Sequence, residues 1–207
     1  MGILNPDGSE AEMCGNGVRA AALYLKSHHT RFKRVKHLDI ETLGGVKHVE
    51  FTKNDCMRVD MEEPALERLG ERIEAPRGEV VFDRIRMGNP HAVIWVEHLE
   101  DARAEELGPW METAQAFPDR TNVEFVEKLG PQEIRVRVWE RGAGFTLACG
   151  TGACAAAVSG LANGRLKSPV KVQLPGGMLT ITWSGREGEP VFMEGPATEV
   201  FWGHSSI

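Results

Sequence analysis

The chain has 207 residues, of which 42% are hydrophobic and 26% charged, so it can bury one large core or two smaller ones. Its net charge of -6 argues against a nucleic-acid partner, because neutralising phosphates requires clustered Lys and Arg. No run of eighteen apolar residues and no secretory leader is evident, so we expect a cytoplasmic protein with no membrane partner.

The first segments in chain order are a turn and a helix. Asn5-Pro-Asp-Gly8 has Pro and Gly at the second and fourth positions, as in a type I turn. Apolar residues then recur at i, i+3, i+4 and i+7 from Val18 to Leu25, which predicts a helix over residues 15–27. Cys14 lies at the N-terminal end of this helix.

Strands are predicted next. The basic stretch of residues 31–37 interleaves charged and apolar residues, and we expect it to form a solvated edge strand. Residues 38–61 alternate in short apolar runs that are broken at Gly44-Gly45 and Asn54-Asp55, which is typical of strands joined by turns. Further strands are expected at residues 80–87 and 92–96.

The second half begins with a polar helix predicted over residues 103–116 and stopped by Pro118. Strict alternation over residues 134–138 predicts a strand with one buried face, and Glu140-Arg141 lies where it ends. A helix over residues 152–162 is closed by Asn163-Gly164, and residues 170–183 have the pattern of a hairpin that turns at Gly176-Gly177.

An internal repeat carries the chemistry. Met13-Cys-Gly-Asn-Gly-Val-Arg-Ala-Ala-Ala22 matches Ala148-Cys-Gly-Thr-Gly-Ala-Cys-Ala-Ala-Ala157, so each copy places Cys-Gly-x-Gly at the start of a helix of small residues. Cys56 and Cys154 lack this context and are interpreted as packing residues. With no Cys-x-x-Cys pair, we expect no metal site and no disulfide framework.

Two cysteines at helix N-termini suit proton transfer. The helix dipole and unpaired N–H groups can lower the pKa of a thiol from ~8.5 toward ~3.5 to 7.5. Two thiols on opposite faces of one carbon can invert it, one removing the α-proton while the other delivers a proton. No pyridoxal-binding signature is evident, so we expect a reaction without a cofactor, in which helix-end donors stabilise the carbanion.

Four separated motifs resemble the diaminopimelate epimerase family: Asn5–Gly17, Gly88–His91, Thr121–Phe125 and Glu140–Gly152. The resemblance implies an α/β (α+β) fold of two pseudo-symmetric domains, each a curved mixed sheet around a central helix. It also implies interconversion of LL- and meso-2,6-diaminopimelate, a small-molecule amino-acid substrate, on the route to lysine and peptidoglycan precursors. Cys14 and Cys149 are then the catalytic acid/base pair.

Other roles follow from the same resemblance, residue by residue. Neutral amides, a bidentate Arg, a carboxylate and helix-end donors suit a substrate with two carboxylates and two ammonium groups. His91 and Glu140 are expected to tune the site beside the thiols. The residues expected to bind substrate are Asn5, Gly15, Asn16, Asn89, Asn122, Glu140, Arg141, Gly150 and Thr151.

The resemblance also sets the expected organisation. Residues 1–60 are expected to form the first half, completed by a C-terminal strand at residues 196–207, and residues 61–195 the second half. Family members usually have additional strands before the turn at Asn5, so we expect the chain to be truncated at its N-terminus, and the family often forms homodimers. Phe145 stands where many members have Glu, a departure we expect to matter little.

Several alternatives stay open at this level. A proline or hydroxyproline racemase shares the two-thiol chemistry, although those families usually have His where this chain has Asn16. A histidine racemase and an inactive truncated fragment are further alternatives. A cysteine hydrolase with His91 as its base would leave the second Cys-Gly-x-Gly motif unexplained.

Overall fold

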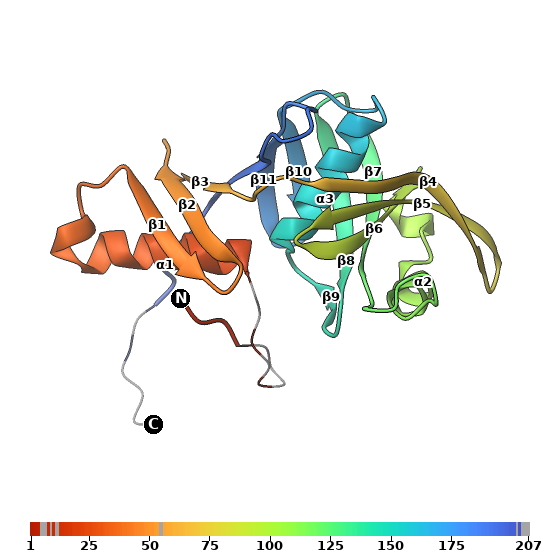
Figure 1. Ribbon diagram of the computed structural model, residues 1–207, viewed down its shortest axis with the longest axis horizontal. Helices are drawn as coiled ribbons and strands as arrows, with labels where there is room; N and C mark the ends of the chain where they lie inside the picture. Colours follow the sequence, from red (N-terminus) through yellow and green to blue (C-terminus); the bar gives the residue numbers. More distant parts are fainter. Residues whose placement is uncertain (5–7, 9, 11–12, 54–55, 202, 204–207) are drawn as a thin grey trace. The chain divides into compact units, whose positions relative to one another are not determined.

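The computed structural model describes residues 1–4, 8, 10, 13–53, 56–201 and 203 (Figure 1). The chain divides into two compact units: unit 1 comprises residues 1–60 and 194–207, and unit 2 comprises residues 61–193. None of the helices in these described ranges is long and apolar enough to cross a membrane. The turn predicted at Asn5–Gly8 falls mostly outside the described residues, as does the break at Asn54-Asp55.

Unit 1 packs one helix against a small antiparallel sheet. The helix α1 contacts all three strands of the hairpin region, and Val18 and Ala22 on its inner face are completely buried. This confirms the helix predicted over residues 15–27. The elements of unit 1 are α1 (Gly15–His28), the 3-10 turn η1 (Thr30–Phe32), β1 (His37–Thr42), β2 (Gly45–Phe51) and β3 (Cys56–Asp60).

The basic stretch after α1 is not the strand we expected over residues 31–37. Successive backbone hydrogen bonds from Phe32 to His29 and from Lys33 to Thr30 fold it into a 3-10 turn, and β1 begins only at His37. The turn reverses the chain directly after α1, so that β1 can lie against the helix that precedes it. The charged residues of this stretch therefore line a solvated connection.

Unit 2 wraps a curved mixed sheet around a central helix. Its strands follow the order β11-β10-β8-β7-β6-β5-β4, with β6–β7 and β8–β10 parallel and the remaining pairs antiparallel. The elements of unit 2 are β4 (Ala65–Ala75), β5 (Gly78–Met87), β6 (Asn89–Val96), η2 (Leu99–Asp101), α2 (Ala104–Glu112), β7 (Asn122–Gly130), β8 (Glu133–Glu140), β9 (Gly144–Thr146), α3 (Gly150–Ala162), β10 (Val170–Leu174) and β11 (Gly177–Thr182).

The helix α3 is the centre of unit 2. It contacts six strands, β5 to β8 with β10 and β11 (Figure 1), and its residues from Gly152 to Gly160 are all buried. A helix that is apolar all round is stable only inside a core, which explains its run of small residues. At Gly160 a Cβ would meet Leu166 Cδ1 at 2.3 Å, so glycine is required for this close approach. The mixed α+β class, with a helix enclosed by a curved sheet, is confirmed.

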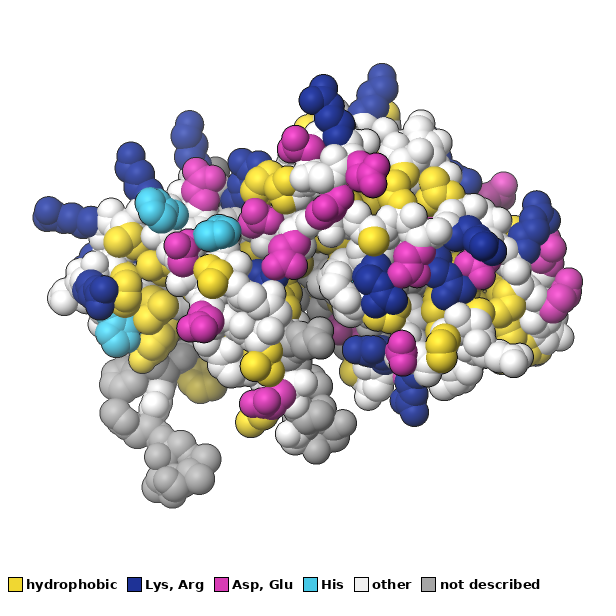
Figure 2. All heavy atoms as spheres, in the orientation of Figure 1, with side chains coloured by type: hydrophobic (Ala, Val, Ile, Leu, Met, Phe, Trp, Pro, Cys, Tyr) yellow, Lys and Arg dark blue, Asp and Glu magenta, His cyan; other side chains and the backbone are white. Residues whose placement is uncertain are grey.

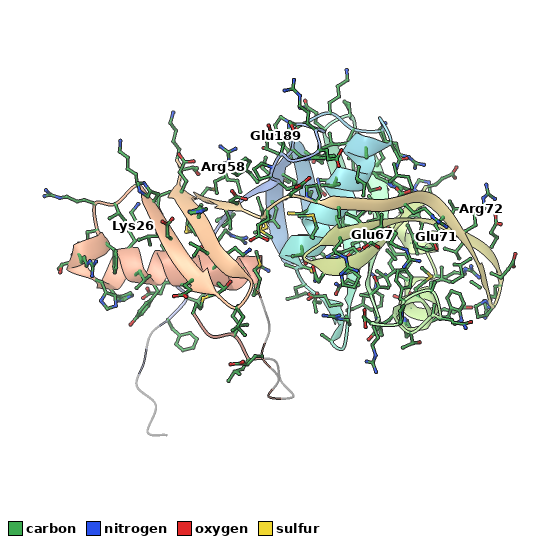
Figure 3. All side chains as sticks on the ribbon, viewed as in Figure 1. Lys26, Arg58, Glu67, Glu71, Arg72 and Glu189 are labelled. Atoms are coloured by element: carbon green, nitrogen blue, oxygen red, sulfur yellow. The ribbon has the colours of Figure 1, made fainter. Side chains whose placement is uncertain are left out.

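The long strand β4 has no counterpart among the predicted strands, because few of its side chains are buried, although Ile73 and Ala75 near its end pack against the core of unit 2. Most of its side chains are exposed, and charged pairs join it to β5. Arg84 binds Glu71 at 2.8 Å, Arg86 binds Glu67 at 2.8 Å, and Arg72 pairs with Glu79. Glu67, Glu71 and Arg72 are labelled along the strand in Figure 3, and acidic and basic side chains lie side by side on the face shown in Figure 2.

The helix α2 ends at Glu112, four residues before the predicted end. The chain turns there because Ala114 N–H bonds to Met111 O and Phe117 N–H to Ala114 O. These turns bring Phe117 against Phe82, with 5.6 Å between ring centroids, inside the core of unit 2. Burial of one aromatic ring therefore ends the helix before Pro118 is reached.

The hairpin predicted at residues 170–183 is confirmed, but Leu174 pairs with Gly177, so the turn lies at Pro175-Gly176, one residue before the predicted position. Beyond it, β12 (Phe192–Pro196) leads the chain from unit 2 into unit 1. The C-terminal strand is therefore earlier than residues 196–207, and the described residues 197–201 and 203 belong to no strand. Pro196 fits the end of a strand because it has no N–H to donate to a neighbour.

Candidate active site

The two copies of the repeat have the same local structure. Cys14 caps α1 with φ -138° and ψ 105°, and Cys149 caps α3 with φ -122° and ψ 116°. In each, the backbone N–H three residues later donates to the sulfur, over 3.3 Å from Gly17 and 3.4 Å from Gly152. A thiol sulfur thus takes the place of the usual Ser or Asp oxygen at a helix N-cap. Gly15 and Gly150 follow as the first residues of the two helices, and both are buried.

Cys149 is a buried thiol that holds its proton. Burial raises its pKa far above the usual value, the negative charge of Glu140 raises it further, and Glu124 adds to this whenever it is ionised. Hydrogen bonds from Thr151 and from the Gly152 N–H lower the pKa but do not compensate. The expectation that the helix end lowers the pKa of this thiol is therefore wrong for Cys149, because desolvation and the nearby charge of Glu140 outweigh the helix dipole.

A row of polar side chains leads away from Cys149. Its sulfur lies 3.5 Å from Thr151 Oγ1, which accepts a hydrogen bond from Asn89 Nδ2 over 3.4 Å. Asn89 Oδ1 lies 2.9 Å from His91 Nε2, and His91 Nδ1 lies 2.7 Å from Glu124 Oε1. Asn89, His91 and Thr151 are thus brought together as the sequence predicts, and Glu124 extends the row into the core.

The end of β8 holds a second group of predicted residues. Asn122 is buried, donates to Pro90 O and accepts a hydrogen bond from the Arg141 N–H. The side chain of Arg141 is exposed and donates to Asp119 O, whereas Glu140 is half-buried and accepts from the Thr146 hydroxyl. Asn122 therefore fixes the backbone of the loop that presents Glu140 and Arg141.

Two other side chains support this loop. Glu112 is buried at the end of α2, and it accepts from Trp139 Nε1 at 2.7 Å and from the Gly142 N–H at 2.9 Å. Phe145 packs edge-on against Trp139, with ring centroids 5.1 Å apart, and the guanidinium of Arg137 lies over it at 4.4 Å. Phe145 therefore has a packing role at this position.

In unit 1, the candidate residue Cys14 is half-buried. Asn16 Oδ1 accepts from Arg19 NH2 over 3.0 Å, and Arg19 Nε also donates to Pro196 O over 3.4 Å. Arg19 is almost completely buried and ties the first turn of α1 to β12. Asn5 lies outside the described residues.

The model of the family described as diaminopimelate epimerase matches residues 1–67 and 84–200 of this chain. The diaminopimelate epimerase of Desulforudis audaxviator is 47% identical over 218 aligned residues, which cover 98% of this chain and 77% of the relative. That of Pseudomonas paraeruginosa is 43% identical and covers 97% and 76%. The chain belongs to the diaminopimelate epimerase family.

Solved structures agree with this membership at the level of fold. A probable proline racemase from Agrobacterium radiobacter superposes with a TM-score of 0.73 at 17% identity, covering 94% of this chain and 68% of that one. A phenazine biosynthesis protein of the PhzF family from Bacillus anthracis gives a TM-score of 0.68 at 14% identity, covering 91% and 74%. The fold of this diaminopimelate epimerase family member is thus shared with proteins of low sequence identity.

Three site residues were not found from the sequence. Glu124 lies two positions after Asn122 on β7, so the same alternation that places the amide on the site face also places this carboxyl there. Arg19 follows Asn16 by three residues, the spacing of helix neighbours, which was an available signal. Glu112 reaches the loop after β8 from a separate helix, and no local pattern indicates that contact.

Proposed function

We propose that this chain interconverts LL- and meso-2,6-diaminopimelate without a cofactor, as an isomerase in the synthesis of lysine and peptidoglycan precursors. One observation carries the proposal: in a member of the diaminopimelate epimerase family, two cysteines cap two helices with the same backbone geometry and the same N–H···S hydrogen bond. Duplicated thiols are what inversion of a single carbon requires.

Each thiol carries out one of the two proton transfers. In one direction, Cys14 as a thiolate removes the α-proton, and Cys149 donates its S–H proton to the opposite face of the carbanion. The raised pKa of Cys149 suits this donor role, because the thiol is protonated before substrate arrives. The cycle leaves Cys14 protonated and Cys149 as a thiolate, which is the starting state for the reverse reaction. The proposal requires the two sulfurs to face one α-carbon.

The substrate is held by groups that suit its charges. The α-carboxylate is expected to accept hydrogen bonds from the first N–H groups of α1 and α3, where Gly15, Gly150 and Thr151 lie and the helix dipoles favour an anion. These donors also stabilise the negative charge of the carbanion, and each such donor typically contributes about 2.7 to 4 kcal/mol. The remaining polar groups would bind Asn5, Asn16, Asn89, Asn122, Glu140 and Arg141.

We place the reaction in the cytoplasm, where thiols stay reduced. All four cysteines are free, and the chemistry needs Cys14 and Cys149 as thiols. An oxidising compartment would convert such groups into disulfides or sulfenic acids.

The proposal is tested by incubating the purified chain with LL-diaminopimelate and following meso product by chiral chromatography. We expect conversion until the LL and meso isomers reach equilibrium. We expect no change of L-proline, hydroxyproline or L-histidine under the same conditions. Racemisation of one of these three amino acids without conversion of diaminopimelate would assign the chain a different substrate. A folded protein that converts none of them would contradict the proposal.

A further inference from the structure

Glu124 is a buried carboxyl group to which the two-thiol mechanism gives no role. Its side chain and that of His91 are both completely buried. Its Oε1 atom lies 2.7 Å from His91 Nδ1, whereas Oε2 is buried and has no hydrogen-bond partner among the described residues. An ionised carboxylate with one unsatisfied oxygen is costly in such a place, whereas the carbonyl oxygen of a neutral acid is less so.

Glu124 is connected to the reacting sulfur by two routes. The first is the row of hydrogen bonds through His91, Asn89 and Thr151 to Cys149 Sγ. The second is direct packing: a Cβ on Gly152 would lie 2.7 Å from Glu124 Oε1, and the N–H of Gly152 donates to Cys149 Sγ. The carboxyl group therefore borders the helix end that holds the thiol.

The direction of the hydrogen bonds determines which ring nitrogen of His91 carries a proton. Asn89 donates its amide to Thr151, so its carbonyl oxygen faces His91 and can only accept. Nε2 of His91 must therefore be protonated. Nδ1 then either accepts a proton from a neutral Glu124 or donates one to an ionised Glu124, and the pair carries no net charge in either case.

Burial favours the state in which Glu124 and His91 are each uncharged over the state in which both are ionised. Desolvation raises the pKa of Glu124 above its usual value, and the nearby charge of Glu140 raises it further, although His91 opposes the shift. The other titratable group facing this cluster is Cys149, whose own pKa is raised by a charge on Glu124. A neutral Glu124 thus avoids an isolated negative charge beside the thiol when that thiol ionises during turnover.

We propose that Glu124 is a positioning residue for Cys149: as a neutral acid it donates to His91 Nδ1, fixes the Nε2–H tautomer of the ring, and so aligns Asn89 and Thr151 against the sulfur. The proposal deepens the two-thiol function and rests on it. Glu124 itself touches no substrate in this account. It acts through the row of side chains that ends at Cys149.

Three variants separate this role from simple packing. Glu124→Gln keeps a donor for Nδ1 at nearly the same size, and Glu124→Leu keeps the volume but removes the donor. Glu127→Gln is the matched control, because Glu127 is a buried carboxylate on the same strand that binds Arg135 and the Leu99 N–H instead. Each is assayed for kcat and KM with LL-diaminopimelate, with melting temperature as the check on folding.

We expect kcat of Glu124→Gln to stay within about threefold of wild type, and kcat of Glu124→Leu to fall about 10- to 100-fold, the effect of leaving one buried partner unsatisfied. KM should change little in Glu124→Gln and rise in Glu124→Leu, because Asn89 and Thr151, which the row aligns, also bind substrate in the proposed function. The Glu127→Gln control should keep its kcat. Equal loss in Glu124→Gln and Glu124→Leu, or a Glu124→Leu variant with the wild-type kcat, would overturn the proposal.

The substrate-free protein gives a readout that does not depend on activity. In ¹⁵N-histidine-labelled protein, His91 should show a protonated Nε2 and an unprotonated Nδ1, both in wild type and in Glu124→Gln. Two protonated nitrogens in wild type would show an ionised Glu124 and overturn the proposal, even if Glu124→Leu does not fold. If wild type fails to convert diaminopimelate, the proposed function fails, and the His91 spectrum still decides the state of Glu124.

Discussion

At the scale of single residues, two opposing effects act on the Cys149 thiol. Its position at the N-terminus of α3 favours the thiolate, and so do the hydrogen bonds from Thr151 and Gly152. Burial and the charge of Glu140 favour the thiol, and they dominate. In the proposed reaction, Cys149 therefore keeps its proton until the substrate carbanion accepts it.

This balance predicts how Glu140→Gln changes thiol reactivity. The negative charge of Glu140 disfavours the thiolate, so its removal should lower the pKa of Cys149 and increase the thiolate fraction at a given pH. We expect Cys149 to react about 3- to 10-fold faster with iodoacetamide at pH 8.5, since one pKa unit corresponds to a tenfold change in that fraction. Mass spectrometry of the peptide that contains Cys149 measures the rate. An unchanged or slower rate would show that Glu140 does not set this pKa.

At the scale of elements, the repeated helix starts differ in what surrounds their third residue. A Cβ on Gly17 would lie 3.4 Å from Cys14 Sγ, an ordinary contact. A Cβ on Gly152 would lie 2.7 Å from Glu124 Oε1, much closer than atoms approach without a shift. Glycine at this position is therefore restricted by packing in α3, at Gly152, but not in α1, at Gly17.

The pair Gly17→Ala and Gly152→Ala tests this difference. Alanine at position 17 should leave the free energy of unfolding unchanged or raise it by up to about 1 kcal/mol, because alanine favours helices. Alanine at position 152 should lower it by about 1 to 3 kcal/mol, the usual cost of overpacking a core. Urea denaturation of both variants measures the two changes, and equal effects at the two positions would contradict the structure.

The sequence predicts those elements whose stability comes from local patterns. The start of α1 follows from the Cys-Gly-x-Gly repeat, α3 begins at Gly150, two residues before its predicted start, and β8 follows from strict alternation over residues 134–138. The strand β4 is mostly exposed and is joined to β5 by charged pairs, a pattern that alternation does not reveal. Segments 31–37 and 113–117 form turns because neighbouring elements must pack, and that information is tertiary.

For the candidate site, the motifs and their order indicate which residues belong to it but not which side chains they contact. The row from Cys149 through Thr151 and Asn89 to His91 brings together side chains from α3 and β6, and each had been named as a candidate. The carboxyl that ends the row, Glu124, was missed because buried charge is rare and its partner is 33 residues away. Alternation along β7 predicts its face but cannot predict its burial.

At the scale of the whole molecule, the chain consists of two compact units, each with one Cys-capped helix against a sheet. The reaction proposed above needs one thiol from each unit, so neither unit is expected to epimerise alone. This division gives a reason for the internal repeat, since the same kind of Cys-capped helix occurs once in each unit and supplies one of the two acid/base groups.

The family resemblance also predicts a homodimer. Sedimentation velocity of the purified chain should give a mass twice that of the 22.8 kDa chain at micromolar concentration. A single monomer peak that persists over a tenfold increase in concentration would contradict this expectation. The two-thiol chemistry itself does not depend on the result.

The central claim is that one thiol from each unit acts on one α-carbon. It is tested most directly by NMR of LL-diaminopimelate in deuterium oxide with wild type, Cys14→Ser and Cys149→Ser. We predict meso product carrying deuterium at the inverted carbon with wild type, and a loss of product formation of about 10²- to 10⁴-fold in each variant. Wild-type turnover in either cysteine variant would contradict the account, because a single thiol would then suffice.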